Sequence, residues 1–442
     1  MPGQHARVAG ARTAGLRNWA GNVEFRATGL LMPRSVGELQ ELVGQTPRLR
    51  AVGTGHSFSS LADTDGLLIS AAGLPGRVDV NEQAGTATVS SGLRYSDIAP
   101  RLQAAGRALQ NLGSLPHISV GGAVATGTHG SGSANGSLAT AVAAIELVRA
   151  DGDLVTVSRE NDPDQLAGLV VGLGAPGIVT ALTLDTVPAF GMRQYAYTGL
   201  RVDVAAEHFA EVMSAGYSVS LFSDFRGADA SSTGAHGPDF SQVWVKLTDG
   251  QQPPPPGWLG TRLADRDLHP VRGMPASGST PQLGLAGPSH ERLPHFRPEY
   301  VPSVGEELQS EYLIAVTDAP AALPVVAALR ADLAPVLRVW EVRTVAADEL
   351  WLSPCYQRAT AALHFTWLPD LRAVVPVLAR LEAALRPFAP RPHWGKIFTL
   401  SPAEVAARYP RLDDFRSLVA AYDPAGKFAT PMLADYLGRQ GR

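Results

Sequence analysis

The sequence predicts an α+β protein with at least two domains. Its 442 residues exceed the usual length of a single domain, and an apolar share of 45% is enough for a large core. Predicted strands and helices alternate up to about residue 187. A stretch rich in proline and glycine comes later, and further alternation of helix and strand lies beyond it. We therefore expect a first domain at 1–187 and a sheet-based second domain after it.

The first elements are a helix and short strands. In LMPRSVGELQELVGQ (31–45), Ser35 precedes apolar residues at helical spacing and should cap the helix. RLRAV (48–52) and GLLIS (66–70) predict strands. GRVDVNEQAGTATVSSG (76–92) predicts two strands joined by a turn at 83–85.

Helices and strands continue to residue 187. The segment 95–109 predicts a helix with Ser96 as its N-cap, and 143–158 predicts a hairpin that turns at Asp151 and Gly152. A short helix, a glycine-rich bend and a strand should follow in 162–187. In the second domain, 251–260 and 272–289 predict surface loops, and 321–345 predicts helix and strand. A last helix should end at Pro424 and Gly426.

Composition excludes several classes of protein. The net charge is −4 and no basic stripe occurs, which argues against a nucleic-acid partner. No apolar run reaches the length of a membrane span, and the N-terminus lacks a signal-peptide pattern. Cys355 is the single cysteine, so no intrachain disulfide can form. We expect a cytoplasmic monomer with a loosely attached arm at 1–16.

The stretch RAVGTGHSFSS (50–60) places a histidine just beyond a glycine pair. Gly53 and Gly55 follow a predicted strand, but the third glycine of a dinucleotide fingerprint would fall on Phe58, and no clear helix opens there. The loop alone is compatible with phosphate binding or with a tight exit from the strand.

The segment 111–138 is a second region rich in glycine and serine. Its many backbone N–H groups and hydroxyls could satisfy a pyrophosphate without basic side chains. A flexible linker is the alternative, but the apolar spacers Leu115, Ile118, Val120 and Val124 argue against it. Two such loops indicate a dinucleotide that lies along backbone.

Polar pairs mark two later strands. On LRVWEVRTV (337–345), Glu341 and Arg343 share a face, and on ALHFTWL (362–368), His364 and Thr366 share a face opposite apolar residues. Spacing alone favours a surface ion pair and a solvated strand edge over a substrate pocket.

Long motifs give the chain a family resemblance. GTGHSFSSLADTDGLLIS, SLPHISVGGAVATGTHGSG, GYSVSLFSDFR, HERLPHFR, ELQSEYL and RPHWGK, spread between about 18 and 428, resemble those of the bacterial alditol (xylitol) oxidases. These are FAD-linked oxidases of the vanillyl-alcohol-oxidase (PCMH) fold type. The resemblance implies a two-lobed FAD-binding domain at 1–187, a substrate-binding cap domain at 188–393 and a C-terminal segment, 394–442, that returns to the FAD domain. The departures from the family are the N-terminal arm, the insert at 251–256 and the last dozen residues.

The resemblance assigns the cofactor site. It implies that His56 attaches FAD covalently, and the lack of a cysteine in 111–138 implies that this histidyl link is single. The other residues implied to contact FAD are Gly53, Thr54, Gly55, Ser57, Ser114, Ser119, Gly122, Thr126, Gly127, Thr128, His129, Ile178 and His393. No metal is expected.

The resemblance also implies oxidation of the terminal primary hydroxyl of an alditol to the aldose, with O₂ as the final acceptor and H₂O₂ as a product. Ser114, Glu341, Arg343, Thr366 and Lys396 would line the polyol pocket. Arg343 and Lys396 would stabilise the developing alkoxide and the charge on the cofactor, and Glu341 would hold Arg343. His364 would either be a proton partner or support the residues that touch the substrate. Gly113, as a small residue, would admit O₂.

Three alternatives remain at this point. A sugar-1,4-lactone oxidase or dehydrogenase shares the loop with histidine and the HWGK motif. An NADPH-dependent reductase on the same fold would lack the covalent histidine. A flavin-carrying sensor would show no turnover, and the cluster of Glu341, Arg343 and Lys396 argues against it.

Overall fold

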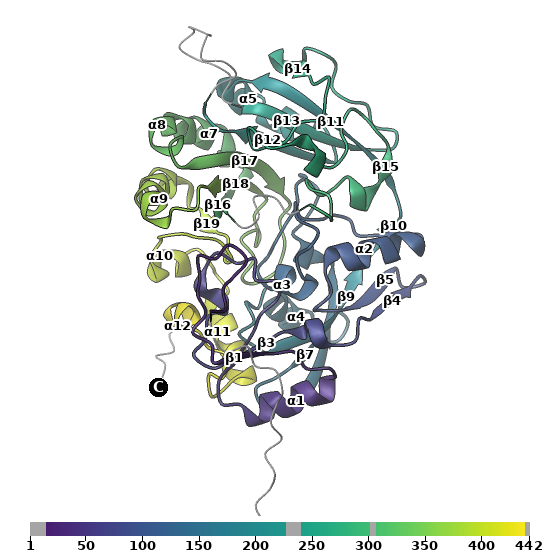
Figure 1. Ribbon diagram of the computed structural model, residues 1–442, viewed down its shortest axis with the longest axis vertical. Coiled ribbons are helices and arrows are strands. Elements are labelled where there is room, and N and C mark those ends of the chain that lie inside the picture. The colour runs from purple at the N-terminus through teal and green to yellow at the C-terminus, as the bar shows by residue number, and fades with distance from the viewer. Residues whose placement is uncertain (1–14, 227–239, 301–305, 438–442) are drawn as a thin grey trace, which may run out of the picture.

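The computed structural model describes residues 15–226, 240–300 and 306–437. The molecule is elongated, with an N-terminal lobe below a second lobe in Figure 1. The lower lobe holds two main sheets. One is parallel, in the order β1 (Gly29–Leu31), β3 (Leu67–Ile69), β2 (Leu49–Ala51). The other is antiparallel, in the order β4 (Val78–Asn81), β5 (Thr86–Ser90), β9 (Ile178–Asp185), β7 (Val142–Val148), β8 (Leu154–Ser158).

Local sequence signals account for most elements of this lobe. The predicted cap is confirmed, because the Ser35 side chain accepts a hydrogen bond from the N–H of Glu38 at the start of α1 (Val36–Gln45). The hairpin of β7 and β8 and the turn between β4 and β5 are confirmed as well. The remaining helices of the lobe are α2 (Tyr95–Ala104), α3 (Val120–Ala125) and α4 (Pro163–Val170), and a short ribbon pairs β6 (Arg107–Ala108) with β10 (Val187–Pro188).

The predicted cap of α2 is wrong by two residues. Ser96 lies inside the helix, which begins at Tyr95 after Arg94. The carboxylate of Asp97 accepts a hydrogen bond from the backbone N–H of Arg94 at 2.9 Å. An acidic residue at the third helical position can thus satisfy the N-terminus and move the start of a helix away from a nearby serine.

One large antiparallel sheet organises the upper lobe. Its nine strands come from residues 191–392, and the proposed domain boundary near residue 187 precedes all of them. Their order is β14 (Arg262–Leu263), β11 (Gly191–Leu200), β13 (Phe240–Thr248), β12 (Ser218–Ser223), β17 (Leu337–Val345), β18 (Thr360–Trp367), β16 (Leu308–Ala315), β19 (Arg391–Pro392), with β15 (Gly287–Pro288) paired to β11.

The two faces of this sheet differ in chemistry. On the helix-covered face, Trp340, Phe365 and Trp367 stack in parallel, with ring centroids 6.2 and 5.3 Å apart. The alternate residues of the same strands, such as Glu341 and His364, point the opposite way, as the period of two requires. The covering helices are α5 (Val202–Glu207), α6 (Phe209–Met213), α7 (Ala319–Ala328), α8 (Arg330–Leu333) and α9 (Leu371–Leu385).

The chain after the large sheet returns to the lower lobe, where its yellow helices lie beside the purple N-terminal elements in Figure 1. Phe428 is fully buried against Leu31 and Leu39 in a small core of that lobe. The last predicted helix is confirmed as α11, and the segment comprises α10 (Pro402–Ala406), α11 (Leu412–Tyr422) and α12 (Pro431–Leu437).

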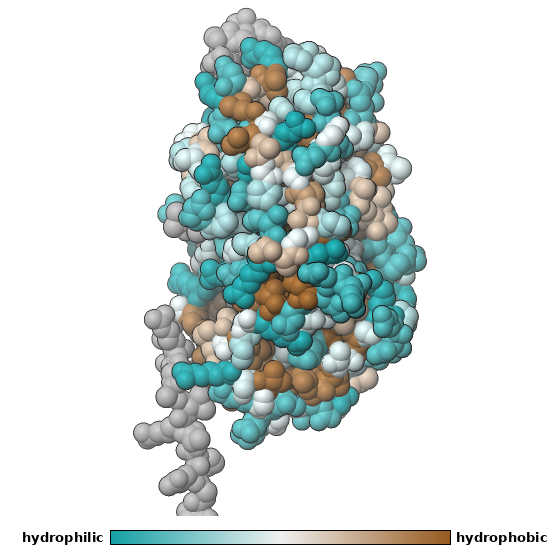
Figure 2. Space-filling view, turned by 90° about the vertical axis from the view of Figure 1, so that its right-hand side faces the viewer, coloured by the Kyte–Doolittle hydropathy of each residue, from teal (hydrophilic) through white to brown (hydrophobic). Residues whose placement is uncertain are grey.

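Figure 2 shows mostly hydrophilic residues with separate hydrophobic groups among them on one face of the molecule. None of the helices in the described ranges is both long and apolar enough to cross a membrane. Most of the predicted arm, 1–14, lies outside the described residues, whereas the carbonyl of Leu16 accepts a hydrogen bond from the N–H of Phe25. The monomeric state and the cytoplasmic location stay predictions.

Candidate active site

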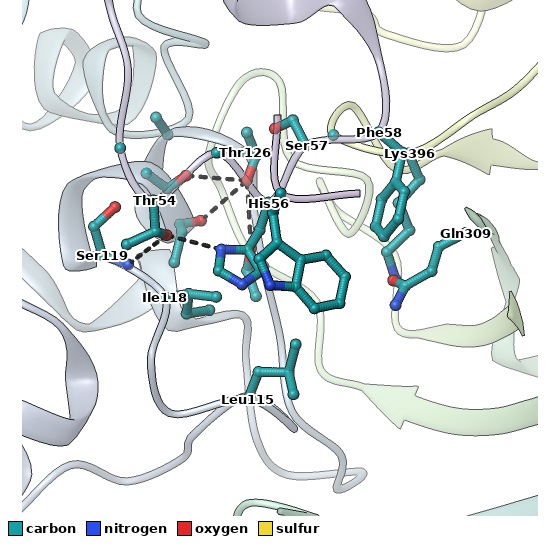
Figure 3. Close-up of a pocket in the computed structure, with 18 of the residues that line it drawn as sticks. Thr54, His56, Ser57, Phe58, Leu115, Ile118, Ser119, Thr126, Gln309 and Lys396 are labelled. Carbon is teal, nitrogen blue, oxygen red and sulfur yellow. Dashed lines mark hydrogen bonds between the residues drawn. The ribbon is translucent and has the colours of Figure 1, made fainter. Parts of the chain in front are cut away.

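A cavity of about 450 Å³ is lined by residues of both lobes. In Figure 3, the loop residues Thr54 and His56 lie on one side of it, and Gln309 and Lys396 lie on the other. It is lined by all but two of the residues expected to form the site, namely Gly53, Thr54, Gly55, His56, Ser57, Ser114, Ser119, Gly122, Thr126, Thr128, His129, Ile178, Glu341, Arg343, His364, Thr366, His393 and Lys396.

Gly113 and Gly127 are the two exceptions. A Cβ on Gly127 would lie 3.4 Å from Cδ of Pro354, and Gly127 has a φ of +68°, so it serves the turn after α3. Gly113 is buried behind Ser114, where a Cβ would lie 3.6 Å from Cγ2 of Thr128. The cofactor contact of Gly127 stays a prediction, and Gly113 lies behind the cavity wall.

The two glycine-rich segments meet at close range. A Cβ on Gly53 would collide with Oγ of Ser119, and one on Gly122 would lie only 2.8 Å from the same oxygen. Oγ1 of Thr54 accepts a hydrogen bond from the N–H of Ser119 at 3.2 Å, which ties the segments together. A side chain at Gly53 or Gly122 would therefore require the Ser119 hydroxyl to move, and glycine at both positions leaves room for it.

His56 lies at the end of the first loop. Its Nδ1 is 3.0 Å from Oγ1 of Thr54, its ring stacks on Trp19 at 4.9 Å, and its Nε2 is buried with no hydrogen-bond partner among the described residues. Burial, with the charges of His117 and Arg94, lowers the pKa of His56 to about 4. At neutral pH the imidazole is therefore uncharged and keeps a nucleophilic lone pair.

These features fit the FAD that the sequence predicts. Gly53, Gly55 and Gly122 line the cavity beside the hydroxyl-bearing residues Ser119, Thr126 and Thr128. Such a surface suits a pyrophosphate. The unpaired nitrogen of His56 supplies a group for a covalent link. Cys355, by contrast, is buried and does not line the cavity, and burial raises the pKa of its thiol to about 12.

The upper lobe contributes a row of ionisable side chains from three adjacent strands. Glu341 of β17 pairs in register with His364 of β18, and His364 pairs with Glu311 of β16. Neighbouring strands are about 4.8 Å apart, so the sheet itself aligns the three groups along one wall of the cavity.

Glu311 is the centre of this row and is almost completely buried. Its Oε1 accepts a hydrogen bond from Arg343 at 2.8 Å, and its Oε2 accepts one from Nζ of Lys396 at 2.7 Å. Nε2 of His129, from the lower lobe, lies 3.4 Å from Oε1. Burial opposes ionisation of Glu311, but Lys396, His129 and Arg343 outweigh it and hold the pKa well below its usual range.

Glu341 has a different principal partner from the predicted one. Its Oε1 lies 2.7 Å from Nε2 of His295, whereas Nε of Arg343 is 3.5 Å away. Arg343 instead makes its hydrogen bonds with Glu311 and, through NH1 at 3.3 Å, with Oγ of Ser114. The predicted contact of Glu341 with Arg343 is present as an ion pair, but the shorter ion pair of Arg343 is with Glu311.

Lys396, His364 and Thr366 form a chain of polar contacts. Nζ of Lys396 lies 2.7 Å from Nδ1 of His364, and Nε2 of His364 lies 3.1 Å from Oγ1 of Thr366. Burial, with the charge of Lys396, lowers the pKa of His364 well below its ordinary value. Burial lowers the pKa of Lys396 as well, while Glu311 opposes that shift.

The sequence reasoning missed Glu311, His295 and Gln309 as parts of the site. All three lie in motifs that carry the family resemblance, ELQSEYL and HERLPHFR. The alternation of Glu307, Gln309 and Glu311 was a usable signal, since a period of two places all three on one face of a strand. Nothing in the local pattern marked His295, which reaches Glu341 from a loop.

Comparisons with known proteins agree with this architecture. Residues 27–158 match the family described as FAD binding domain, and residues 306–437 match D-arabinono-1,4-lactone oxidase. An alditol oxidase from Streptomyces sp. (strain IKD472 / FERM P-14339) is 49% identical over 423 residues, covering 95% of this chain and 98% of that protein. The chain belongs to the alditol oxidase family.

The chain is also similar, at lower identity, to a sugar-lactone dehydrogenase and to the solved structure of a cholesterol oxidase. An L-gulono-1,4-lactone dehydrogenase from Mycobacterium tuberculosis is 29% identical over 446 residues, covering 96% of this chain and 98% of that protein. Among solved structures, cholesterol oxidase from B. sterolicum matches with a TM-score of 0.75 at 14% identity, covering 95% of this chain and 96% of its own. The predicted fold class, an FAD-binding domain of the vanillyl-alcohol-oxidase type with a sheet-based second domain, is confirmed.

Proposed function

We propose that the protein oxidises the terminal primary hydroxyl of alditols such as xylitol or sorbitol to the aldose, with O₂ as the electron acceptor. The observation that supports this most is the wall of Glu341, Arg343, His364 and Lys396, which faces the loop of His56 across one cavity. Several donors and acceptors on one wall suit a substrate with several hydroxyls. The 49% identity to an alditol oxidase points to the same substrate class.

The redox chemistry belongs to the cofactor, and the chain holds it. The residues that would hold FAD are the loop 53–57, Ser119, Gly122, Thr126, Thr128 and His129, with His56 as the single covalent link. Bound FAD supplies a hydride acceptor at N5 and returns the electrons to O₂, which gives H₂O₂.

Lys396 is suited to stabilise the substrate oxygen. As an ammonium it has three N–H donors; one points to Glu311 and one to Nδ1 of His364. The third is left for the reacting hydroxyl. Because Lys396 donates to Nδ1, the neutral imidazole of His364 carries its proton on Nε2 and donates to Thr366. The Thr366 hydroxyl hydrogen is then available to another substrate oxygen.

Glu341 and Ser114 can make further hydrogen bonds to the substrate hydroxyls. Oε2 of Glu341 accepts no hydrogen bond from the described residues, and the side chain lines the cavity, so this oxygen can accept a substrate O–H. Oγ of Ser114 accepts from Arg343 and keeps its own hydrogen for a substrate hydroxyl. Arg343 places a permanent positive charge beside the reacting oxygen, since Glu341 and Glu311 outweigh burial and raise its pKa.

The second candidate is oxidation of a sugar-1,4-lactone. It is favoured by the family match over residues 306–437, which contain most of the polar wall. A lactone presents its reacting hydroxyl on a ring, whereas an alditol is an open chain.

A peroxide-coupled assay tests both candidates. The holoenzyme is offered xylitol, sorbitol, mannitol, glycerol and L-gulono-1,4-lactone at equal concentrations, with a dye acceptor in parallel under argon. We expect the highest kcat/KM with an alditol, and peroxide in equal amount to the substrate oxidised. Higher turnover of the lactone, or turnover with dye alone, would replace the proposal with the lactone oxidase or dehydrogenase activity.

A further inference from the structure

A buried lysine outside the proposed catalytic set contacts His295, the residue that hydrogen-bonds Glu341 in the cavity wall. Lys246 of β13 is 1% exposed, and its Nζ donates to the carbonyls of Leu293 at 2.6 Å and Pro294 at 2.9 Å. Its third contact is Nδ1 of His295 at 3.2 Å. Burial lowers the pKa of Lys246 well below its ordinary value, while the charge of Glu341 opposes that shift. The three acceptors around Nζ favour the ammonium, because a buried charge is costly unless its donors are all satisfied.

The hydrogen-bond donors and acceptors fix where the protons lie. Oε1 of Glu341 lies 2.7 Å from Nε2 of His295, and an ionised carboxylate can only accept, so Nε2 carries a proton. In a neutral imidazole Nδ1 is then an acceptor. Lys246 donates to it, and with two carbonyls as further acceptors all three N–H groups of an ammonium are used.

The surroundings keep His295 neutral. Its ring meets Phe222 and Trp244 edge to face, with centroids 5.5 and 5.3 Å apart. Burial, followed by the charge of Lys246, lowers the pKa of His295 to about 4, while Glu341 opposes that shift. The charged groups that face this pair are Lys246 from β13, Glu341 and Arg343 from β17, and beyond Glu341 the side chains of His364 on β18 and Glu311 on β16; Ser220 of β12 is neutral.

We propose that Lys246 is a positioning residue: by donating to Nδ1 of His295 it keeps this imidazole a one-proton donor to Oε1 of Glu341, and so leaves Oε2 of Glu341 to the substrate. This inference rests on the proposed function, in which Glu341 accepts a substrate hydroxyl. A protonated His295 would partly neutralise the charge of Glu341. The hydrogen bond that Glu341 accepts from a substrate hydroxyl would then be weaker. Lys246 excludes that state by placing a second positive charge against Nδ1.

The direct test is the protonation of His295 in the holoenzyme, followed by NMR with ¹⁵N-labelled histidine. The signals of His295 are assigned by their loss in His295→Gln. In the wild type we expect a neutral ring with the proton on Nε2 at every pH above 5. In Lys246→Met the titration should move upward, towards the ordinary pKa of 6.5. Identical titration curves for the two proteins would overturn the proposal, whatever substrate the enzyme uses.

The pH profile of kcat/KM gives an independent readout. Between pH 8 and pH 6, we expect kcat/KM of Lys246→Met to fall ~3-fold more than that of the wild type, because a histidine whose pKa approaches 6.5 is about three-quarters protonated at pH 6 and its protonation weakens a charge-assisted hydrogen bond. His295→Gln is the matched control, since its amide donates to Glu341 and accepts from Lys246 but cannot titrate. The double variant Lys246→Met/His295→Gln should therefore lose the extra acid limb. Persistence of the limb in the double variant would assign it to another group and overturn the proposal.

Failure of the proposed function gives a different pattern. If the wild type oxidises none of the alditols, the proposed substrate is wrong, while the NMR titration still decides whether Lys246 controls His295. If Lys246→Met is too unstable to isolate, the wild type and His295→Gln still discriminate: a wild-type His295 that is protonated at pH 6 overturns the proposal.

Discussion

Lys396 and Glu311 form a buried ion pair, Nζ to Oε2 at 2.7 Å, which links the last segment of the chain to the middle strand of the polar wall. Glu311 binds Arg343 with its other oxygen, so one carboxylate orients both cations that face the cavity. Because burial lowers the pKa of Lys396 and Glu311 raises it, the charge of the lysine depends on this glutamate.

Glu311→Gln should therefore lower kcat/KM with an alditol by at least ~100-fold, since it weakens two charge-assisted hydrogen bonds worth about 1.5–3 kcal/mol each. An amide also leaves Arg343 and Lys396 with uncompensated positive charge, so the melting temperature should fall. Steady-state kinetics and thermal unfolding measure the two effects. Glu349→Gln, at an exposed glutamate bonded to Gln357, is the control. Equal kinetics for the two variants would contradict a central role for Glu311.

The ionised Glu341 predicts how stability depends on pH. Burial favours its neutral form, but Arg343 and His295 outweigh burial and hold the folded pKa below the ordinary value. A depressed folded pKa adds stability that is complete above the unfolded pKa of about 4.3 and disappears as pH falls through the folded value. Urea unfolding between pH 7 and pH 3 should show a shallower acid loss in Glu341→Gln than in the wild type. Parallel curves would show that the pKa of Glu341 is the same in the folded and unfolded states.

Lys396→Met should lower the rate of flavin reduction by an alditol at least ~10-fold to 100-fold, because the reacting oxygen loses a charged donor. Anaerobic stopped-flow absorbance measures this rate without interference from reoxidation. Lys427→Met is the control, since Lys427 donates to the carbonyl of Val43 in the lower lobe. A near-wild-type reduction rate in Lys396→Met would remove the proposed role of the lysine.

The sequence predicted most elements and the residues of two site strands, because both depend on local patterns. Alternation along 337–345 and 362–368 fixed which side chains share a face. It could not show that Glu311 lies beside His364, since β16 and β18 are separated by more than forty residues and only the sheet register brings them together.

Contacts between the two lobes, or between a loop and a strand, could not be predicted from the sequence either. Glu341 makes its short hydrogen bond with His295 from a loop, and its predicted partner Arg343 makes its shorter ion pair with Glu311. The role of Lys246 could not be foreseen either, because in the sequence it is one of several polar residues in strand β13. Long-range electrostatic partners depend on tertiary packing, which spacing along one strand does not report.

The covalent link is tested by His56→Ala. The wild type should keep its yellow colour after acid precipitation and show one added FAD mass, because the uncharged imidazole of His56 is poised for attachment. The variant should release its flavin into the supernatant. His208→Ala, at a surface histidine beside Glu211, should retain covalent flavin. Flavin that survives acid treatment of His56→Ala would assign the link to another residue.

Oxygen access is tested at Gly113. The glycine is buried behind Ser114, and a Cβ there would make ordinary contacts of 3.6–3.8 Å with Thr128, His129 and Ile118, so alanine fits without strain. A methyl group would fill the space through which O₂ is proposed to approach. Gly113→Ala should therefore reoxidise more slowly while its anaerobic reduction rate stays close to that of the wild type, and Gly113→Val should be slower still. Mixing the reduced enzyme with oxygenated buffer in stopped flow measures this step, and an unchanged rate in both variants would show that O₂ reaches the flavin by another route.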